Sequence, residues 1–303
     1  MAVQTEIWVK YIMTRLWKDN SFLKFAFNDD QYVVGGKIVH IPQPGAKPTV
    51  VKNRTVFPAV TVKRTDTDIT YTLDGYTTDP THIEKAEMEE ITYDKINSVF
   101  GDHAGQLVET IAEDMIIKWL TGLGAGNIVR TTGAAAAGKV TGQTGNRKVM
   151  VHGDLKSAKL KLDLANVPKM DRYALLESNM MDELFTSLSD TQYRDFSQYA
   201  DAKEGIVGRL YGFNIIDRSK VAISTSALAI EALGAAIDAT DHVVSMAWQK
   251  DAVTRAIGEK KFFENKDDAE FYGDVYSALV RAGGRRRRTG DEGIVAIIQD
   301  AAS

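Results

Sequence analysis

The sequence of 303 residues predicts an α+β protein with about two domain-lengths of chain. Three patterns support that prediction: one long amphipathic helix, a proline-rich stretch flanked by strand-like pieces, and a second half that mixes helices and strands without regular β-α-β alternation. The composition, with 44% hydrophobic and 26% charged residues, is typical of a folded protein. It argues against a disordered or fibrous chain.

The first predicted element is a short amphipathic helix over residues 5–17, on which Trp8, Ile12 and Leu16 recur at near-helical spacing. Four large apolar side chains follow it: Phe22, Leu23, Phe25 and Phe27. So much apolar surface on a terminal arm needs a cover. Another subunit and the chain's own core are both possible covers.

Residues 31–64 form the next distinctive stretch, because five of the six prolines lie between Pro42 and Pro80. Prolines at this density are excluded from central strands and helix interiors, so we expect an extended excursion or long hairpin with strand pieces at 37–41 and 60–63. Residues 31–64 contain no acid and six bases: Lys37, Lys47, Lys52, Arg54, Lys63 and Arg64. Long excursions of this kind are usually functional. A half-buried strand is predicted over 68–76.

A long helix is predicted over residues 92–121, because pairs of apolar residues recur every four positions and Gly122 provides a C-terminal stop. From Glu84 to Lys118 the charge is −6. The acids at the start of this stretch that we expect to face the basic excursion are Glu87, Glu89, Glu90 and Asp94. Opposite charges on contacting surfaces set their register and association rate.

The remaining residues predict a mixture of shorter elements. Residues 122–147 are rich in Gly, Thr and Ala, which indicates loops around at most a short strand. After them we expect helices over 154–166, 178–188 (with Ser178 as N-cap) and 225–239, and strands over 172–176, 208–217, 243–248, 271–280 and 294–298.

The composition excludes several classes of function. The absence of cysteine removes disulfides, thiolate zinc sites and a cysteine nucleophile. The five histidines are scattered, adjacent acids diverge on a helix, and no serine-nucleophile elbow occurs, so we expect no catalytic residue, metal or cofactor. A net charge of −4 argues against a basic nucleic-acid coat, and no apolar run of about 18 residues suggests a membrane span. We expect a soluble, unexported protein.

Two local motifs need weighing. Residues 133–140 (GAAAAGKV) approach a phosphate-binding loop, but Val140 stands where Ser or Thr should hold magnesium. The basic run consists of Arg285, Arg286, Arg287 and Arg288, between Gly283-Gly284 and Thr289-Gly290, which predict a turn. Four arginines can grip DNA phosphates. The alternative, which we favour, is pairing with carboxylates of the same or another subunit.

The order of these pieces resembles the major capsid proteins of tailed bacteriophages, which have the Hong Kong 97-type fold. The most specific stretches are RYALLESNMMDELFTSLSD, GIVGRLYGFNIIDRS and the ending AEFYGDVYSALVRAGGRRRRTGDEGIVAII. The resemblance implies an N-terminal arm (1–30), an extended loop (31–78), a peripheral domain with the spine helix (79–150), a central domain (151–260) and closing strands (261–303).

The resemblance also implies a function and partners. Copies would assemble as pentamers and hexamers into an icosahedral virion shell around double-stranded DNA, inside the host bacterial cytoplasm, with the loop of one subunit over the next. A portal protein, a separate scaffolding protein and a decoration protein are the expected partners. Covalent crosslinking is not expected, because residues 269–284 contain no asparagine. The alternatives are an encapsulin-like nanocompartment and, in another class, a nucleotide-binding enzyme using residues 133–140.

Overall fold

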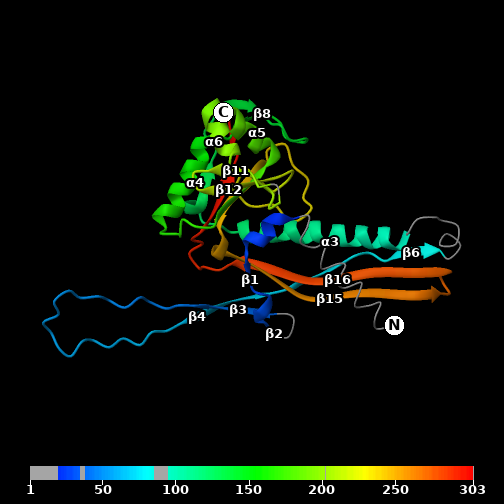
Figure 1. Cartoon of the computed structure of the whole chain (residues 1–303), viewed down its shortest axis with the longest axis horizontal. Helices are drawn as coiled ribbons and strands as arrows, with labels where there is room; N and C mark the ends of the chain where they lie inside the picture. The colour runs from blue at the N-terminus through cyan, green and yellow to red at the C-terminus, as the bar shows by residue number, and fades with distance from the viewer. Residues whose placement is uncertain (1–19, 35–37, 85–94, 202, 303) are drawn as a thin grey trace.

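The computed structural model describes residues 20–34, 38–84, 95–201 and 203–302. The predicted helix over 5–17 therefore lies outside the described residues. The chain forms a compact module and a long platform beside it, and a thin loop leaves one end of the platform (Figure 1). The prediction of an α+β fold is confirmed.

The platform is a five-stranded sheet in the order β1-β15-β16-β5, with β6 also paired to β16. Its strands are β1 (Phe27–Asn28), β5 (Asp74–Thr77), β6 (Thr81–Glu84), β15 (Val253–Asp268) and β16 (Gly273–Arg286). The antiparallel β15–β16 pair is its backbone, and α3 (Lys95–Leu120) packs along β16. Gly122 ends this helix with φ +73, as its position predicts.

The compact module is built on a seven-stranded mixed sheet in the order β11-β12-β10-β14-β17-β7, with β13 also paired to β14. Its strands are β7 (Ile128–Arg130), β10 (Arg172–Glu177), β11 (Ile206–Leu210), β12 (Phe213–Arg218), β13 (Ala222–Ser224), β14 (His242–Gln249) and β17 (Ile294–Ile298). Its helices are α4 (His152–Leu164), α5 (Ser178–Ser187) and α6 (Asp190–Ser197). A small sheet of β8 (Ala135–Ala137), β9 (Asn146–Lys148) and β18 (Asp300–Ala301) lies beside it.

The seven-stranded sheet separates two apolar cores, because side chains alternate across a strand. On β10, Ala174 and Leu176 face the core shared with α4 and α5, whereas Tyr173 and Leu175 face the core shared with α3. The α3 core continues to β16 of the platform, so this helix joins the module to the platform. Phe22, Leu23 and Phe25 are buried in the same core, so the chain covers this part of its own arm.

The predicted excursion is a long antiparallel hairpin. Strand β3 (Ile38–Gln43) pairs with β4 (Thr67–Thr72) and with β2 (Val33–Val34), and residues 44–66 between them form no regular structure. The hairpin is confirmed, but the expected strand over 60–63 is wrong. The predicted strand over 68–76 is broken at Leu73 into β4 and β5, which belong to different sheets.

Several other predictions need correction. The strand expected over 208–217 is a hairpin, because Tyr211 and Gly212 adopt positive φ and turn the chain between β11 and β12. The helix expected over 225–239 is an irregular loop. The loop-rich stretch 122–147 holds three short strands, β7 to β9, instead of at most one. Helix α5 is capped by the Glu177 carboxylate, which accepts hydrogen bonds from the Asn179 and Met180 amides, and not by Ser178.

Candidate subunit-contact surfaces

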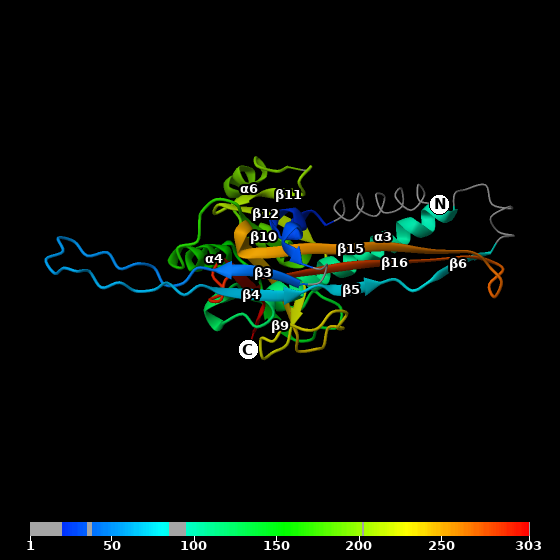
Figure 2. The ribbon, with the colours of Figure 1, turned by 90° about the horizontal axis from the view of Figure 1, so that it is seen from below.

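The loop of residues 44–66 is fixed only at its base. The Gly45 amide donates to Asp66 Oδ1 at 2.7 Å, and Arg64 Nε donates to the same oxygen at 2.5 Å. The Gly45 amide and the Arg64 guanidinium together hold the pKa of Asp66 below its ordinary value. Beyond this clamp the loop extends away from the body (Figures 1 and 2).

The loop carries apolar side chains that its own subunit does not cover. Residues 46–66 are all exposed. Phe57 is 75% exposed, Val50 91% and Val60 87%. Soluble proteins rarely present contiguous apolar patches of this kind unless they bind something. The loop is therefore a candidate contact surface.

The structure places only part of the predicted charged pair. Lys47, Lys52, Arg54, Lys63 and Arg64 all lie on the exposed loop. Lys37 and the four acids Glu87, Glu89, Glu90 and Asp94 lie outside the described residues. The contact between the basic loop and the acidic stretch therefore stays a prediction.

Asp114, on the described part of α3, binds groups of its own subunit. Lys118 Nζ lies 2.7 Å from Asp114 Oδ2 and 2.5 Å from Asp74 Oδ2, so it links α3 to β5. The Tyr76 hydroxyl donates a hydrogen bond to the Asp114 carboxylate. Burial and the bond to Asp114 raise the pKa of Tyr76 above its ordinary value. Asp114 is therefore used to fix the helix on the platform.

The arginine run is mostly structural. Arg285 and Arg286 end strand β16, not a turn, and Arg285 Nη1 donates to Thr70 O at 2.9 Å. Arg286 donates to Asp291 at 2.5 Å and to the last carbonyls of α3. The Arg287 guanidinium stacks 3.8 Å above the Phe27 ring. Arg285 and Arg288 are both exposed, and within the described residues Arg288 is the member of the run whose side chain makes no hydrogen bond, ion pair or ring contact. Within the described residues, Arg286 is the one member of the run that pairs with a carboxylate, and contact of the run with DNA or with another subunit stays a prediction.

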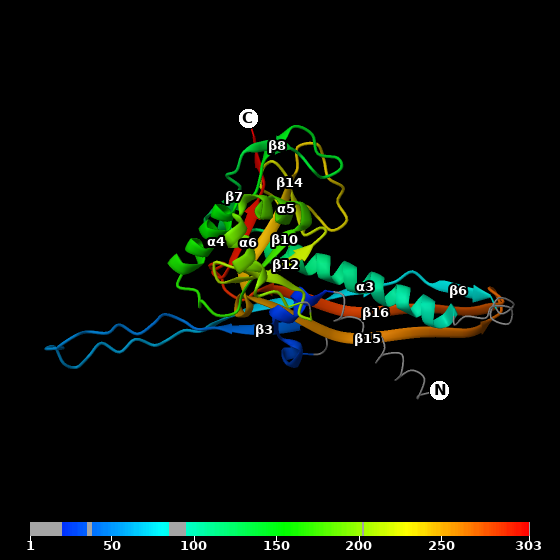
Figure 3. The same cartoon turned by 45° about the horizontal axis from the view of Figure 1, so that its top comes forward.

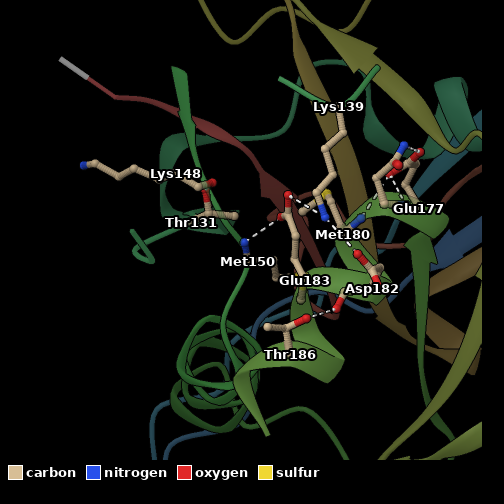
Figure 4. Close-up of polar contacts among 10 residues, drawn as sticks. Thr131, Lys139, Lys148, Met150, Glu177, Met180, Asp182, Glu183 and Thr186 are labelled. Atoms are coloured by element: carbon tan, nitrogen blue, oxygen red, sulfur yellow. Dashed lines mark hydrogen bonds and ion pairs between the residues drawn. The ribbon is translucent and has the colours of Figure 1, made fainter. Parts of the chain in front are cut away.

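The structure contradicts a phosphate loop at residues 133–140. Ala135–Ala137 is strand β8, and a turn follows Lys139 where a helix would be needed. Lys139 Nζ lies 2.8 Å from Asp182 Oδ2 and 3.9 Å from Glu183 Oε1 (Figure 4). The lysine is held by two carboxylates of α5 and not presented to an anion.

Two buried carboxylates belong to the α5 region: Glu177 at its N-cap and Glu183 within the helix (Figure 4). Burial raises the pKa of both, although backbone amides donate to each: Met150 N to Glu183 at 2.8 Å, and Asn179 N to Glu177 at 2.8 Å. These bonds tie α5 to neighbouring segments. Sequence reasoning missed both residues, because nothing in the local pattern marks them as buried.

Within the described ranges, no group of three or more His, Asp or Glu side chains is arranged to hold a metal ion. In the same part of the chain, no helix combines the length and the apolar character that a membrane span requires.

Comparisons with known proteins bear on the fold. No protein-family model matches the sequence, and no curated protein does. Solved structures do match: the capsid of Ralstonia phage GP4 is 12% identical, with a TM-score of 0.63 over 92% of this chain and 88% of that one. The chain has a phage capsid fold. The head structure of Helicobacter pylori bacteriophage KHP40 is also 12% identical, with a TM-score of 0.62 over 94% of this chain and 92% of that one. The capsid of cyanophage P-SCSP1u is 17% identical, with a TM-score of 0.60 and coverage of 92% and 87%.

Proposed function

We propose that this chain is the major capsid protein of a tailed phage, a structural protein whose copies assemble into the icosahedral shell around double-stranded DNA. The observation that carries the proposal is the fold itself, which corresponds to phage capsid structures over more than nine-tenths of the chain. The proposal assigns the chain to the virion, with assembly in the host bacterial cytoplasm. It gives the chain no enzymatic role.

The exposed loop gives this proposal a physical basis. Burying a Val or Phe side chain contributes about 1.5–3 kcal/mol. Phe57, Val50, Val60 and Val62 are each at least 75% exposed. Covering these four would contribute roughly 6–12 kcal/mol to a subunit contact, before the entropic cost of association is subtracted. The loop can gain this energy only by leaving solvent.

The proposed contact places the basic loop of one copy over α3 and the adjoining acidic stretch of the next. In this scheme α3 with the platform is the peripheral part, and the seven-stranded module is the central part around the five- and six-fold axes. A portal protein, a separate scaffolding protein and a decoration protein complete the proposed partners. Packaged DNA would be contacted without sequence specificity, and the proposed contact residue is Arg288, which is exposed and whose side chain has no partner among the described residues.

Electron microscopy of the purified chain, together with light-scattering mass, tests the proposal over a range of salt and protein concentrations. Closed shells, tubes or rings of five or six copies are the expected products. A strict monomer under all these conditions, also when a scaffolding protein is supplied, would overturn the proposal.

A further inference from the structure

An apolar stripe lies on the outer face of α4. Leu160 and Leu164 are 57% and 74% exposed. They are four residues apart, so they share one face of the helix. Met170, on the turn between α4 and β10, is 76% exposed. We call Leu160, Leu164 and Met170 the α4 stripe. Within the described residues nothing covers the stripe, and the opposite face of α4 packs into the module core through Leu155 and Leu162.

An apolar groove of about 320 Å³ lies elsewhere on the same module. Ala222, Ile223 and Val243 form a buried floor, and Val140, Ala235 and Ile237 form its half-buried walls. A dry apolar cavity of about 150 Å³ is large enough to hold a benzene ring. The groove therefore has room for two aliphatic side chains.

The groove is held open by hydrogen bonds between its two walls. Thr144 N donates to Ala239 O at 3.1 Å, and Gln143 Nε2 donates to Asp241 O at 2.9 Å. Gly142 has a φ of +104, and a Cβ there would lie 2.8 Å from Ile237 O, so only glycine allows this close approach. A preformed groove loses less entropy when it binds.

The stripe and the groove lie on opposite sides of the module. Helix α4 is at the left in Figures 1 and 3, and the yellow 225–239 loop that forms one groove wall is at the right. One subunit therefore cannot place its own stripe in its own groove. Two complementary surfaces on opposite sides of a subunit form a heterologous contact, and such contacts repeat head to tail and close into rings.

The charges around the two surfaces are complementary. Residues 155–170 carry four lysines and one aspartate, and Lys156 and Lys169 are exposed. Residues 221–241 carry no base and three acids, of which Asp238 is exposed and Glu231 is half-buried. Lys220 is the one basic residue that lines the groove. A net charge of +3 on residues 155–170 therefore faces a net charge of −2 on residues 220–241, with Lys220 included.

We infer that the α4 stripe of one copy inserts into the groove of a second copy, and that this contact closes the ring of modules. The inference rests on the proposed function, because it names the surfaces through which copies of a shell protein meet. It commits to a second copy of this chain as the occupant. The apolar side chains supply affinity, and the lysines and acids at the edges fix the register.

Because the chain has no cysteine, introduced cysteines can test the contact directly. We would label assembled Leu164→Cys/Ala236→Cys protein with a short bismaleimide and analyse it on a denaturing gel. A head-to-tail contact should give a ladder that extends beyond the dimer. The matched control is Arg194→Cys/Ala236→Cys, because Arg194 lies on the exposed face of α6, which is away from the yellow loop (Figure 2). The control should give no ladder.

A charge exchange provides the second test. Lys156→Glu/Lys169→Glu and Glu231→Lys/Asp238→Lys should each abolish ring formation while circular dichroism and the melting temperature stay those of the wild type. Combining all four substitutions should restore rings. Wild-type particles without a ladder, or reversal variants that assemble normally, would overturn this inference and leave the proposed function standing. A wild-type chain that forms no particle, with or without a scaffolding protein, would overturn both.

Discussion

Reversal of three charges on the exposed loop is the most direct perturbation of the proposed shell contact. Lys47→Glu/Lys52→Glu/Arg54→Glu changes the charge of residues 44–65 from +5 to −1. An exposed ion pair contributes about 0.2–1 kcal/mol, and reversal replaces attraction by repulsion of similar size, so three reversals cost roughly 1–6 kcal/mol per contact. That weakens each contact by about 10- to 10⁴-fold. A shell contains many such contacts, so assembly should fail.

The same three substitutions should leave the folded subunit unchanged, because all three side chains are exposed and, within the described residues, make no ion pair. Surface changes of this kind usually alter stability by within about 0.5 kcal/mol. The assay is electron microscopy and light scattering beside a thermal melt, with Lys47→Arg/Lys52→Arg/Arg54→Lys as the charge-preserving control. High salt should reduce the difference between the two variants. Normal shells from the reversed variant at low salt would refute the reasoning.

Three further predictions concern the subunit itself. Arg172 is 2% exposed, and its guanidinium donates to Asp163 at 2.7 Å. Arg172→Ala should therefore lower the unfolding free energy measured in urea by about 3–5 kcal/mol. Arg172→Lys should not recover this stability, because lysine lacks the planar guanidinium group. A Cβ at Gly208 would lie 2.5 Å from the Phe196 ring, so Gly208→Val should cost about 1–3 kcal/mol; an unchanged melting temperature would contradict this. Burial raises the folded-state pKa of Glu183 above 4.5. The folded state therefore favours the protonated carboxyl, and the stability gained from it is fully present below pH 4.5. That stability is lost as the pH rises through the folded-state pKa and the buried group ionises. Gln cannot ionise, so the unfolding free energy of Glu183→Gln minus that of the wild type should increase from pH 4.5 to neutral pH. A difference that stays constant over this range would contradict the prediction.

Where apolar residues recur at regular spacing, the secondary structure could be predicted from the sequence. Helix α3 was predictable because its apolar positions lie on one face, which packs from Ala104 to Leu120 into the main core and at Phe100 into a small separate cluster with Ile83 and Tyr276. Strand β10 was predictable because all six of its residues are buried and bounded by turn signals. Helix α6 was missed, although its capping box, in which Ser189 and Gln192 exchange hydrogen bonds, is visible in the sequence.

Tertiary context decided the elements that sequence reasoning misjudged. Residues 225–239 are rich in alanine and favour a helix intrinsically. In the structure Thr225 N donates to Ala229 O and Glu231 N to Ile223 O, while Gly234 has a positive φ, so the segment closes as a loop against β13. Strand β15 was missed because its distal half is charged and exposed, and only its pairing with β16 keeps it extended. The candidate groove depends on this loop and was invisible for the same reason.

The loop of residues 44–66 and helix α4 lie on the same side of the subunit, the left in Figure 1, whereas the 225–239 loop that lines the groove lies on the other side. Each copy would therefore present both surfaces to one neighbour and receive both from the other. Once the stripe of one copy has bound the groove of its neighbour, the loop would meet that same neighbour at a high effective concentration. A loop that binds first would favour binding of the stripe in the same way. Two contacts that are individually weak can then close a ring that neither would hold alone. This coupling explains how exposed apolar side chains on the loop can be tolerated in a free subunit: they gain most of their affinity only when a second surface has already selected the right partner.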